Sequence, residues 1–183
     1  KLNSTPDRTS HSSGAYVVSG NEVVRELDEM PKSLSGSPSP VVLANERNLY
    51  LAYLVDGPEP DWSDPSTIES LTPGENICVL RFSHARSHYF GPPGDESLQS
   101  HPLFALGLRW YGSFEVHNSN WIATLERMNS VHHNHNPARF KQLRHFAWSF
   151  HDSIFECVAE DVAAQVRCGL MNEVISELAQ SLG

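Results

Sequence analysis

The sequence predicts a single α+β domain, in which a mainly antiparallel sheet is packed on one side by helices and the chain closes with an amphipathic helix. Two observations lead to this prediction. Short apolar segments with strand-like alternation recur along the 183 residues, and they do not alternate regularly with helical patterns. Residues 1–14 are polar and aperiodic, so we expect a disordered arm before a domain that spans residues 15–183.

The first elements of this domain are predicted to be a helix and a hairpin. Ser19 and Glu22 have the S-x-x-E spacing of a capping box, and apolar residues at helical spacing follow until Pro31. Next, two apolar runs at residues 41–44 and 49–55 flank a polar tetrad, which indicates a β-hairpin. Both faces of the second run are apolar, so we expect it to lie centrally in the sheet. Residues 57–65, with three prolines and three acidic residues, are typical of a solvated loop.

The second half predicts further strands and two helices. Residues 75–90 fit one long strand or two, and residues 110–117 fit another. Asn118 or Ser119 then caps a helix whose apolar face includes Trp121, Ile122, Leu125 and Met128. Residues 144–160 form a predicted hairpin that turns at Asp152 and Ser153. A closing helix is predicted from about Asp161, with its apolar stripe at Val162, Val166, Leu170, Val174 and Leu178.

Composition excludes several classes of function. The net charge of −9 argues against nucleic acid as a partner, because binding to a phosphate backbone needs a basic surface. No apolar run approaches the roughly 20 residues that cross a bilayer, and the first residues do not resemble a secretory signal. Three widely spaced cysteines suit a reducing compartment, so we expect a soluble cytoplasmic protein. Glycine-rich phosphate-binding motifs are absent, so no nucleotide cofactor is expected.

Histidine supplies the strongest functional signal. Nine of the ten histidines lie between His84 and His151, and several stand beside carboxylates or other histidines. Because histidine is the commonest metal ligand and has the unperturbed pKa nearest neutrality, this crowding favours a metal or proton-transfer site.

The hairpin at residues 144–160 offers candidate catalytic residues. Phe146, Trp148 and Phe150 alternate with His145, Ser149 and His151, so one face of the strand is aromatic and the other polar. Glu156 on the returning strand is expected to fall back toward His151. The sequence therefore predicts a site with His151 as general acid–base, oriented by Glu156 or by the adjacent Asp152. A solvent-exposed or hydrogen-bonded polar face without chemistry is the alternative.

A metal centre is the second way to use these histidines. Glu115 and His117 share one side of a strand, and His133 and His135 have H-x-H spacing. Together with His151 they supply the two-histidine, one-carboxylate sets that suit zinc or iron. The competing interpretation is that His117 lines a helix entry and that the 132–135 cluster caps a helix end.

These features leave two functions open. The first is an enzyme, metal-dependent in its main form, that hydrolyses a small molecule through a histidine–carboxylate site. The second is a non-catalytic domain that binds a small molecule or a protein. The wide apolar arc of the closing helix would then serve a homodimer.

Overall fold

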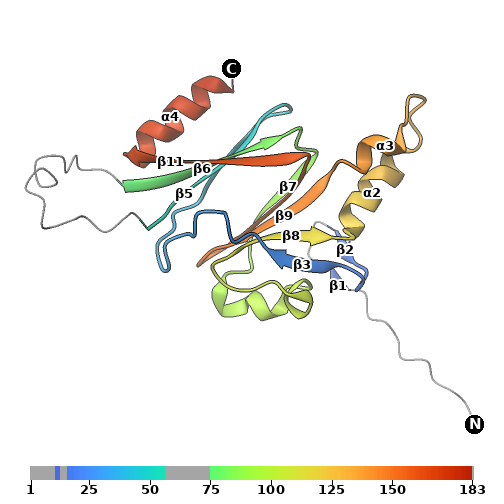
Figure 1. Ribbon diagram of the computed structural model, residues 1–183, viewed down its shortest axis with the longest axis horizontal. Coiled ribbons are helices and arrows are strands. Elements are labelled where there is room, and N and C mark those ends of the chain that lie inside the picture. The colour runs from blue at the N-terminus through green and yellow to red at the C-terminus, as the bar shows by residue number, and fades with distance from the viewer. Residues whose placement is uncertain (1–10, 13–15, 57–74, 183) are drawn as a thin grey trace, which may run out of the picture.

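The computed structural model describes residues 11–12, 16–56 and 75–182, and within them two antiparallel β-sheets lie face to face with few helices (Figure 1). One sheet has five strands in the order β3 (Val23–Glu26), β8 (Ser113–His117), β9 (Arg144–Ser149), β10 (Ile154–Ala159) and β7 (Ser87–Gly91). The other has four, in the order β11 (Asp161–Gly169), β6 (Glu75–Ser83), β5 (Leu49–Leu54) and β4 (Val41–Ala44). A short pair, β1 (His11–Ser12) and β2 (Val17–Val18), forms a separate two-stranded sheet.

The main core lies between the two sheets. Alternate residues of β5 and β6 meet alternate residues of β9 and β10 there, and all of them are buried. The aromatic face predicted for residues 146–150 is confirmed, because these three rings belong to this core. The predicted hairpins at residues 41–55 and 144–160 are also confirmed, and β5 is central with both faces buried.

One antiparallel ladder runs through both sheets at a corner of the sandwich. The predicted strand region at residues 75–90 is divided into β6 and β7, which pair with β11 and β10 respectively. At the corner, residues 84–86 oppose only residues 159–160, so the strand carries an extra residue and bends like a β-bulge. His84 has the left-handed backbone of this bend (φ 50°), and its ring contacts Glu160 at 2.9 Å.

The outer face of the five-stranded sheet is buried under a cover of short elements. The cover consists of the segment at residues 16–22, two 3₁₀ helices η1 (Asp95–Ser100) and η2 (Phe104–Leu106), and α2 (Asn120–Asn129). A second apolar cluster lies between this cover and the sheet. The predicted cap of α2 is confirmed, because the Ser119 side chain accepts a hydrogen bond from Ile122 N. The short α3 (Pro137–Phe140) follows α2.

The outer face of the four-stranded sheet carries α4 (Met171–Ser181), so helices cover both sides of the sandwich rather than one. Val174 of α4 is buried against Tyr50, Ala52 and Leu54 of β5. Because β5 is apolar on both faces, it needs both the opposite sheet and this helix to be covered.

The predicted helix after Ser19 is wrong, because β3 occupies residues 23–26. Ser19 and Glu22 make one of the two contacts of a capping box, because Ser19 N donates to Glu22 Oε1, and Ser19 Oγ also donates to Glu22 Oε2. The two adjacent β-branched residues Val23 and Val24 favour a strand, and the chain pairs with β8. Glu22 instead accepts a bond from Asn120 N at the start of α2.

The predicted start of the closing helix is also wrong, because residues 161–169 form β11. Val162 and Val166 are four apart, a spacing that places residues on one side of a helix and equally on one side of a strand. Pairing with β6 along the whole of β11 decides in favour of the strand. The wide apolar arc that suggested a homodimer is therefore divided between a strand and a helix.

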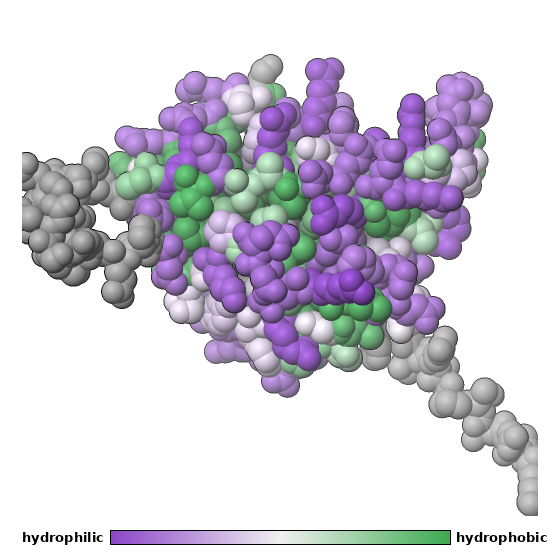
Figure 2. Space-filling view, viewed as in Figure 1, coloured by the Kyte–Doolittle hydropathy of each residue, from purple (hydrophilic) through white to green (hydrophobic). Residues whose placement is uncertain are grey.

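Two predictions fall on other parts of the chain. The loop at residues 57–65 and most of the N-terminal arm lie outside the described residues, while His11 and Ser12 of that arm form β1. None of the helices within the described ranges has the length and hydropathy needed to cross a membrane. Figure 2 shows hydrophilic side chains over much of the face that it presents, with apolar residues in patches between them.

Candidate active site

The turn of the β9–β10 hairpin decides the position of His151. Phe150 N donates to Ser153 O, and Ser149 pairs with Ile154, so the two central turn residues are His151 and Asp152. The predicted turn is therefore displaced by one residue. This displacement removes His151 from the strand and directs it toward the cover.

His151 meets a carboxylate and a phenol supplied by the cover. Its Nδ1 lies 2.8 Å from Asp95 Oδ2 and 3.1 Å from the Tyr111 hydroxyl, and that hydroxyl donates to the same Asp95 oxygen. Nε2 lies 3.9 Å from Asp152 Oδ1, beyond hydrogen-bond distance, and the His151 side chain is 40% exposed. Because Asp95 holds Nδ1–H, Nε2 is the nitrogen that can exchange a proton with a molecule outside.

Backbone contacts fix this arrangement. Asp95 N donates to His151 O at 2.7 Å, and a Cβ at Gly94 would lie 2.7 Å from the same oxygen, so only glycine allows this approach. Tyr111 adopts a left-handed backbone (φ 53°), which costs a residue with a side chain about 1–2 kcal/mol. This strained conformation places the Tyr111 hydroxyl on Asp95.

The three groups change one another's protonation. The hydrogen bond from Tyr111, followed by the bond from His151 and its charge, lowers the pKa of Asp95. The hydrogen bond to Asp95 and the negative charge of that carboxylate raise the pKa of His151 above the usual 6.5. An oriented histidine with a raised pKa suits a group that takes up and returns a proton near neutral pH.

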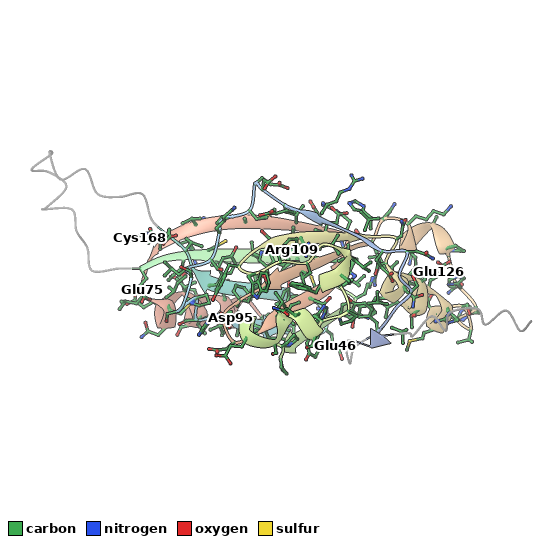
Figure 3. All side chains as sticks on the ribbon, turned by 90° about the horizontal axis from the view of Figure 1, so that it is seen from below. Glu46, Glu75, Asp95, Arg109, Glu126 and Cys168 are labelled. Carbon is green, nitrogen blue, oxygen red and sulfur yellow. The ribbon has the colours of Figure 1, made fainter. Side chains whose placement is uncertain are left out.

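Aromatic and cationic side chains lie next to this site. Trp110 is 39% exposed and donates its Nε1–H to Asp95 O at 2.9 Å. Its ring packs edge-on against Phe104, whose face is covered by the Arg109 guanidinium. Figure 3 shows Asp95 and Arg109 near the middle of the molecule, on the segment that covers the five-stranded sheet. An exposed tryptophan beside such a histidine–carboxylate pair can contact an apolar group of a bound molecule.

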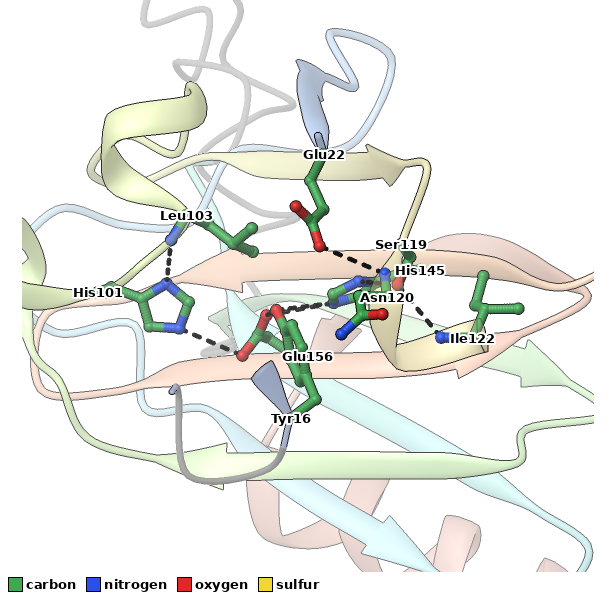
Figure 4. Close-up of polar contacts among 9 residues, drawn as sticks. All are labelled: Tyr16, Glu22, His101, Leu103, Ser119, Asn120, Ile122, His145 and Glu156. Carbon is green, nitrogen blue, oxygen red and sulfur yellow. Dashed lines mark hydrogen bonds and ion pairs between the residues drawn. The ribbon is translucent and has the colours of Figure 1, made fainter. Parts of the chain in front are cut away.

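Glu156 belongs to a different cluster, under the cover (Figure 4). Its carboxylate has no exposed area and lies between two imidazoles, with His101 Nε2 at 3.3 Å from Oε1 and His145 Nε2 at 3.2 Å from Oε2. The Tyr16 hydroxyl donates to Oε2 at 2.6 Å. Glu156 therefore does not orient His151, because the register pairs it with Ala147, inward from the turn.

The hydrogen bonds of the rings assign their protons. Leu103 N donates to His101 Nδ1, so the proton of His101 sits on Nε2 and faces Glu156. Ser119 Oγ lies 2.9 Å from His145 Nδ1 and can donate there, which leaves His145 Nε2–H for Glu156. Burial alone would raise the pKa of Glu156, but the hydrogen bonds from His101 and His145 outweigh burial and hold its pKa at about 2.

Two histidine–carboxylate pairs thus attach the cover to the hairpin in opposite senses. At one end of η1 the cover supplies Asp95 and the hairpin supplies His151. At the other end the cover supplies His101 and the hairpin supplies Glu156. The first pair is accessible to solvent and the second is buried, so the first is the candidate for acid–base chemistry.

The predicted metal ligands lie in separate places. Val116 of β8 pairs with His145, and Ser113 pairs with Trp148, so His117 lies at the end of the sheet away from His151. Glu115 and His117 do share one side of the strand, at 4.0 Å, but the Glu115 carboxylate binds Arg144 at 2.6 Å. That hydrogen bond lowers the pKa of Glu115.

The predicted pair His133 and His135 lies in the loop after α2. The rings of His132 and His133 stack on one another, and His135 Nδ1 contacts Asn129 Oδ1 at 2.9 Å. Across the described ranges, no three histidine, cysteine, aspartate or glutamate residues stand where they could hold a metal ion. Cys78 and Cys157 are buried, and burial raises the pKa of both thiols, to about 11 at Cys78.

Sequence reasoning identified His151 and Glu156 but missed most of their partners. Asp95 follows the Gly-Pro-Pro-Gly segment, which indicates only a turn, and it is 56 residues from His151. Tyr16 and His101 are also remote from Glu156 along the chain, Tyr16 by 140 residues. Only His145 gave a signal, since the alternation of β9 places it on the polar face with Ser149.

The chain matches no model of a known protein family, no curated protein and no solved structure.

Proposed function

We propose that this protein is an enzyme that hydrolyses a small molecule by general acid–base catalysis, with His151 as the proton-transferring group and Asp95 as its orienting carboxylate. The observation that carries the proposal is the 2.8 Å contact between His151 Nδ1 and Asp95 Oδ2, with the opposite ring nitrogen left accessible. We propose the metal-free form of this chemistry, because the predicted metal ligands lie in three separate places. Glu115 and His117 lie on β8, His133 and His135 lie in the loop after α2, and His151 lies in the turn at the opposite end of the sheet.

The chemistry requires one proton to move twice. His151 Nε2 takes a proton from water as the water oxygen bonds to the carbonyl carbon of an ester. The resulting imidazolium, stabilised by Asp95, then donates that proton to the alkoxide as the ester C–O bond breaks. Tyr111 keeps Asp95 ionised and in place throughout, and Trp110 offers a surface for the apolar part of the substrate.

The test is hydrolysis of a panel of p-nitrophenyl esters, from acetate to octanoate, by the purified chain. We expect His151→Asn to lose at least about a hundredfold in kcat/KM, within the range for a lost general base. His117→Asn is the matched control, because its side chain is also 40% exposed but lies at the other end of the sheet. Turnover that survives in His151→Asn, or the absence of turnover of every ester by the wild type, would overturn the proposal.

A further inference from the structure

A hollow at the far end of the five-stranded sheet has the composition of an anion site. A cavity of about 220 Å³ is lined by Arg86, Leu125, Asn129, Arg139, Phe140 and Leu143. A second hollow, of about 390 Å³, adjoins it in the loop between α2 and α3 and shares Asn129, Arg139 and Phe140 with the first. Leu143 immediately precedes β9 and His151 follows its end, so this hollow and the acid–base site lie at opposite ends of that strand.

The figures agree with this separation. Figure 3 shows Glu126 of α2 at one end of the molecule, whereas Asp95 and Arg109 lie near its middle. In Figure 2, hydrophilic residues cover the loop between α2 and α3 at the upper right. The hollow is thus a separate feature that the proposed acid–base chemistry does not use.

Two guanidinium groups reach the hollow from segments far apart in the sequence. Arg86 comes from the bulge at the corner of the sandwich, where its backbone N–H is fixed on Val158 O. Arg139 comes from α3. Within the described part of the chain, neither side chain forms an ion pair, and none of the described residues that line the two hollows is acidic. In a chain with 22 acidic and 13 basic residues, two arginines that line one hollow and form no ion pair with the described residues favour an anionic ligand.

The remaining lining residues restrict the kind of anion. Leu125, Phe140 and Leu143 provide an apolar floor, and Asn129 presents an amide whose Oδ1 already binds His135, so its NH₂ group stays available as a donor. A cavity of roughly 150 Å³ holds a benzene ring, so 220 Å³ accommodates a ring with one small charged group. Planar bidentate pairing with a carboxylate is the geometry that arginine prefers.

We propose that the hollow between Arg86 and Arg139 binds a small organic carboxylate, with its charge on the two guanidinium groups and its apolar part on Leu125, Phe140 and Leu143. This inference stands independently of the proposed hydrolase, because it uses none of the residues of the acid–base site.

The experiment titrates ¹⁵N-labelled protein with phenylacetate, phenylacetamide and inorganic phosphate, and follows the backbone amides of residues 125–143. We expect saturable shifts with phenylacetate and at least tenfold weaker binding of phenylacetamide, which has the same shape without the charge. Inorganic phosphate, which lacks the apolar part, is also expected to bind at least tenfold more weakly.

Three variants locate the charge. Arg86→Gln and Arg139→Gln are each expected to weaken phenylacetate binding about tenfold, as the loss of a hydrogen bond to a charged group does. Arg47→Gln removes the same charge from the β4–β5 turn and should leave binding unchanged. Both target arginines are exposed, so the variants should melt like the wild type.

Four outcomes would overturn the proposal. Equal binding of phenylacetamide would show that the hollow does not select an anion, and equal or tighter binding of phosphate would show that the apolar floor is not used. Binding that is unaffected by both arginine variants would show that the ligand does not bind between Arg86 and Arg139. The absence of binding at millimolar phenylacetate would show that the hollow is not a carboxylate site. The wild-type comparison of the three ligands remains decisive even if a variant fails to fold.

Discussion

Glu156 holds an ionised carboxylate in a place where no part of its side chain reaches solvent. A buried charge is tolerated only when donors surround it, and here Tyr16, His101 and His145 converge on the two oxygens. Each donor comes from a different segment. The buried carboxylate is therefore stabilised only when the cover is correctly packed on the sheet.

Glu156→Gln is expected to destabilise the protein by about 3 kcal/mol, because the amide NH₂ would face groups that are themselves donors. Urea denaturation at pH 7 measures this change. Glu46→Gln is the control, since Glu46 is exposed in the β4–β5 turn and its substitution should alter the free energy of unfolding by less than about 0.5 kcal/mol. Similar values for the two variants would show that Glu156 is not the centre of a structural network.

At the scale of elements, the segment from Gly94 to Gly112 supplies the partners of both hairpin residues. It carries Asp95 and Tyr111 to His151, and it carries His101 to Glu156. Its approach to the hairpin depends on Gly94, where the backbones are too close for a side chain.

Gly94→Ala is expected to displace this segment, since its Cβ would lie 2.7 Å from His151 O and 3.0 Å from Asp152 Cα. We expect a loss of about 1–3 kcal/mol of stability, as overpacking causes, and a lower pKa of His151 because Asp95 moves away. NMR titration of the His151 ring protons measures the pKa. Gly169→Ala is the control, because a Cβ there meets no atom within 4 Å. An unchanged His151 titration in Gly94→Ala would contradict this account of the segment.

The sequence predicted an element correctly where the spacing of its apolar residues fits only one type of secondary structure. The hairpins at residues 41–55 and 144–160 were predictable because period-two alternation and a polar turn agree. Residues 161–169 were not, because spacing of four satisfies both a helix and a strand, and only pairing with β6 decides between them. His151 was predictable as a candidate, but its partner Asp95 was not, since long-range contacts leave no local pattern.

At the scale of the whole molecule, the two histidine–carboxylate pairs predict a pH range of maximal stability. The lowered pKa of Asp95 and of Glu156 means that their stabilisation is present above their usual values of 3.8 and 4.5 and is lost as the pH falls toward the lowered values. The raised pKa of His151 means that its stabilisation is present below 6.5 and is lost as the pH rises through the raised value.

We therefore expect the free energy of unfolding to be highest between about pH 4.5 and 6.5, to fall steeply in acid and to fall gently in alkali. Urea denaturation between pH 2.5 and 9 measures the profile. His151→Asn should remove the alkaline decrease and keep the acid one, whereas Glu156→Gln should flatten the acid decrease. An alkaline decrease that persists unchanged in His151→Asn would assign it to another group.

The bent ladder at the corner has a consequence for how the sandwich can come apart. Two stacked sheets that contact each other only through side chains can slide or separate once water enters the apolar core. Here β6 continues into β7 and β10 into β11, and backbone bonds cross the bend at Arg86 N–Val158 O and Glu160 N–Ser83 O. The corner is itself a hydrogen-bonded ribbon, so the two sheets cannot separate without breaking backbone hydrogen bonds. We therefore expect the two sheets to unfold together, and neither sheet to persist while the other unfolds.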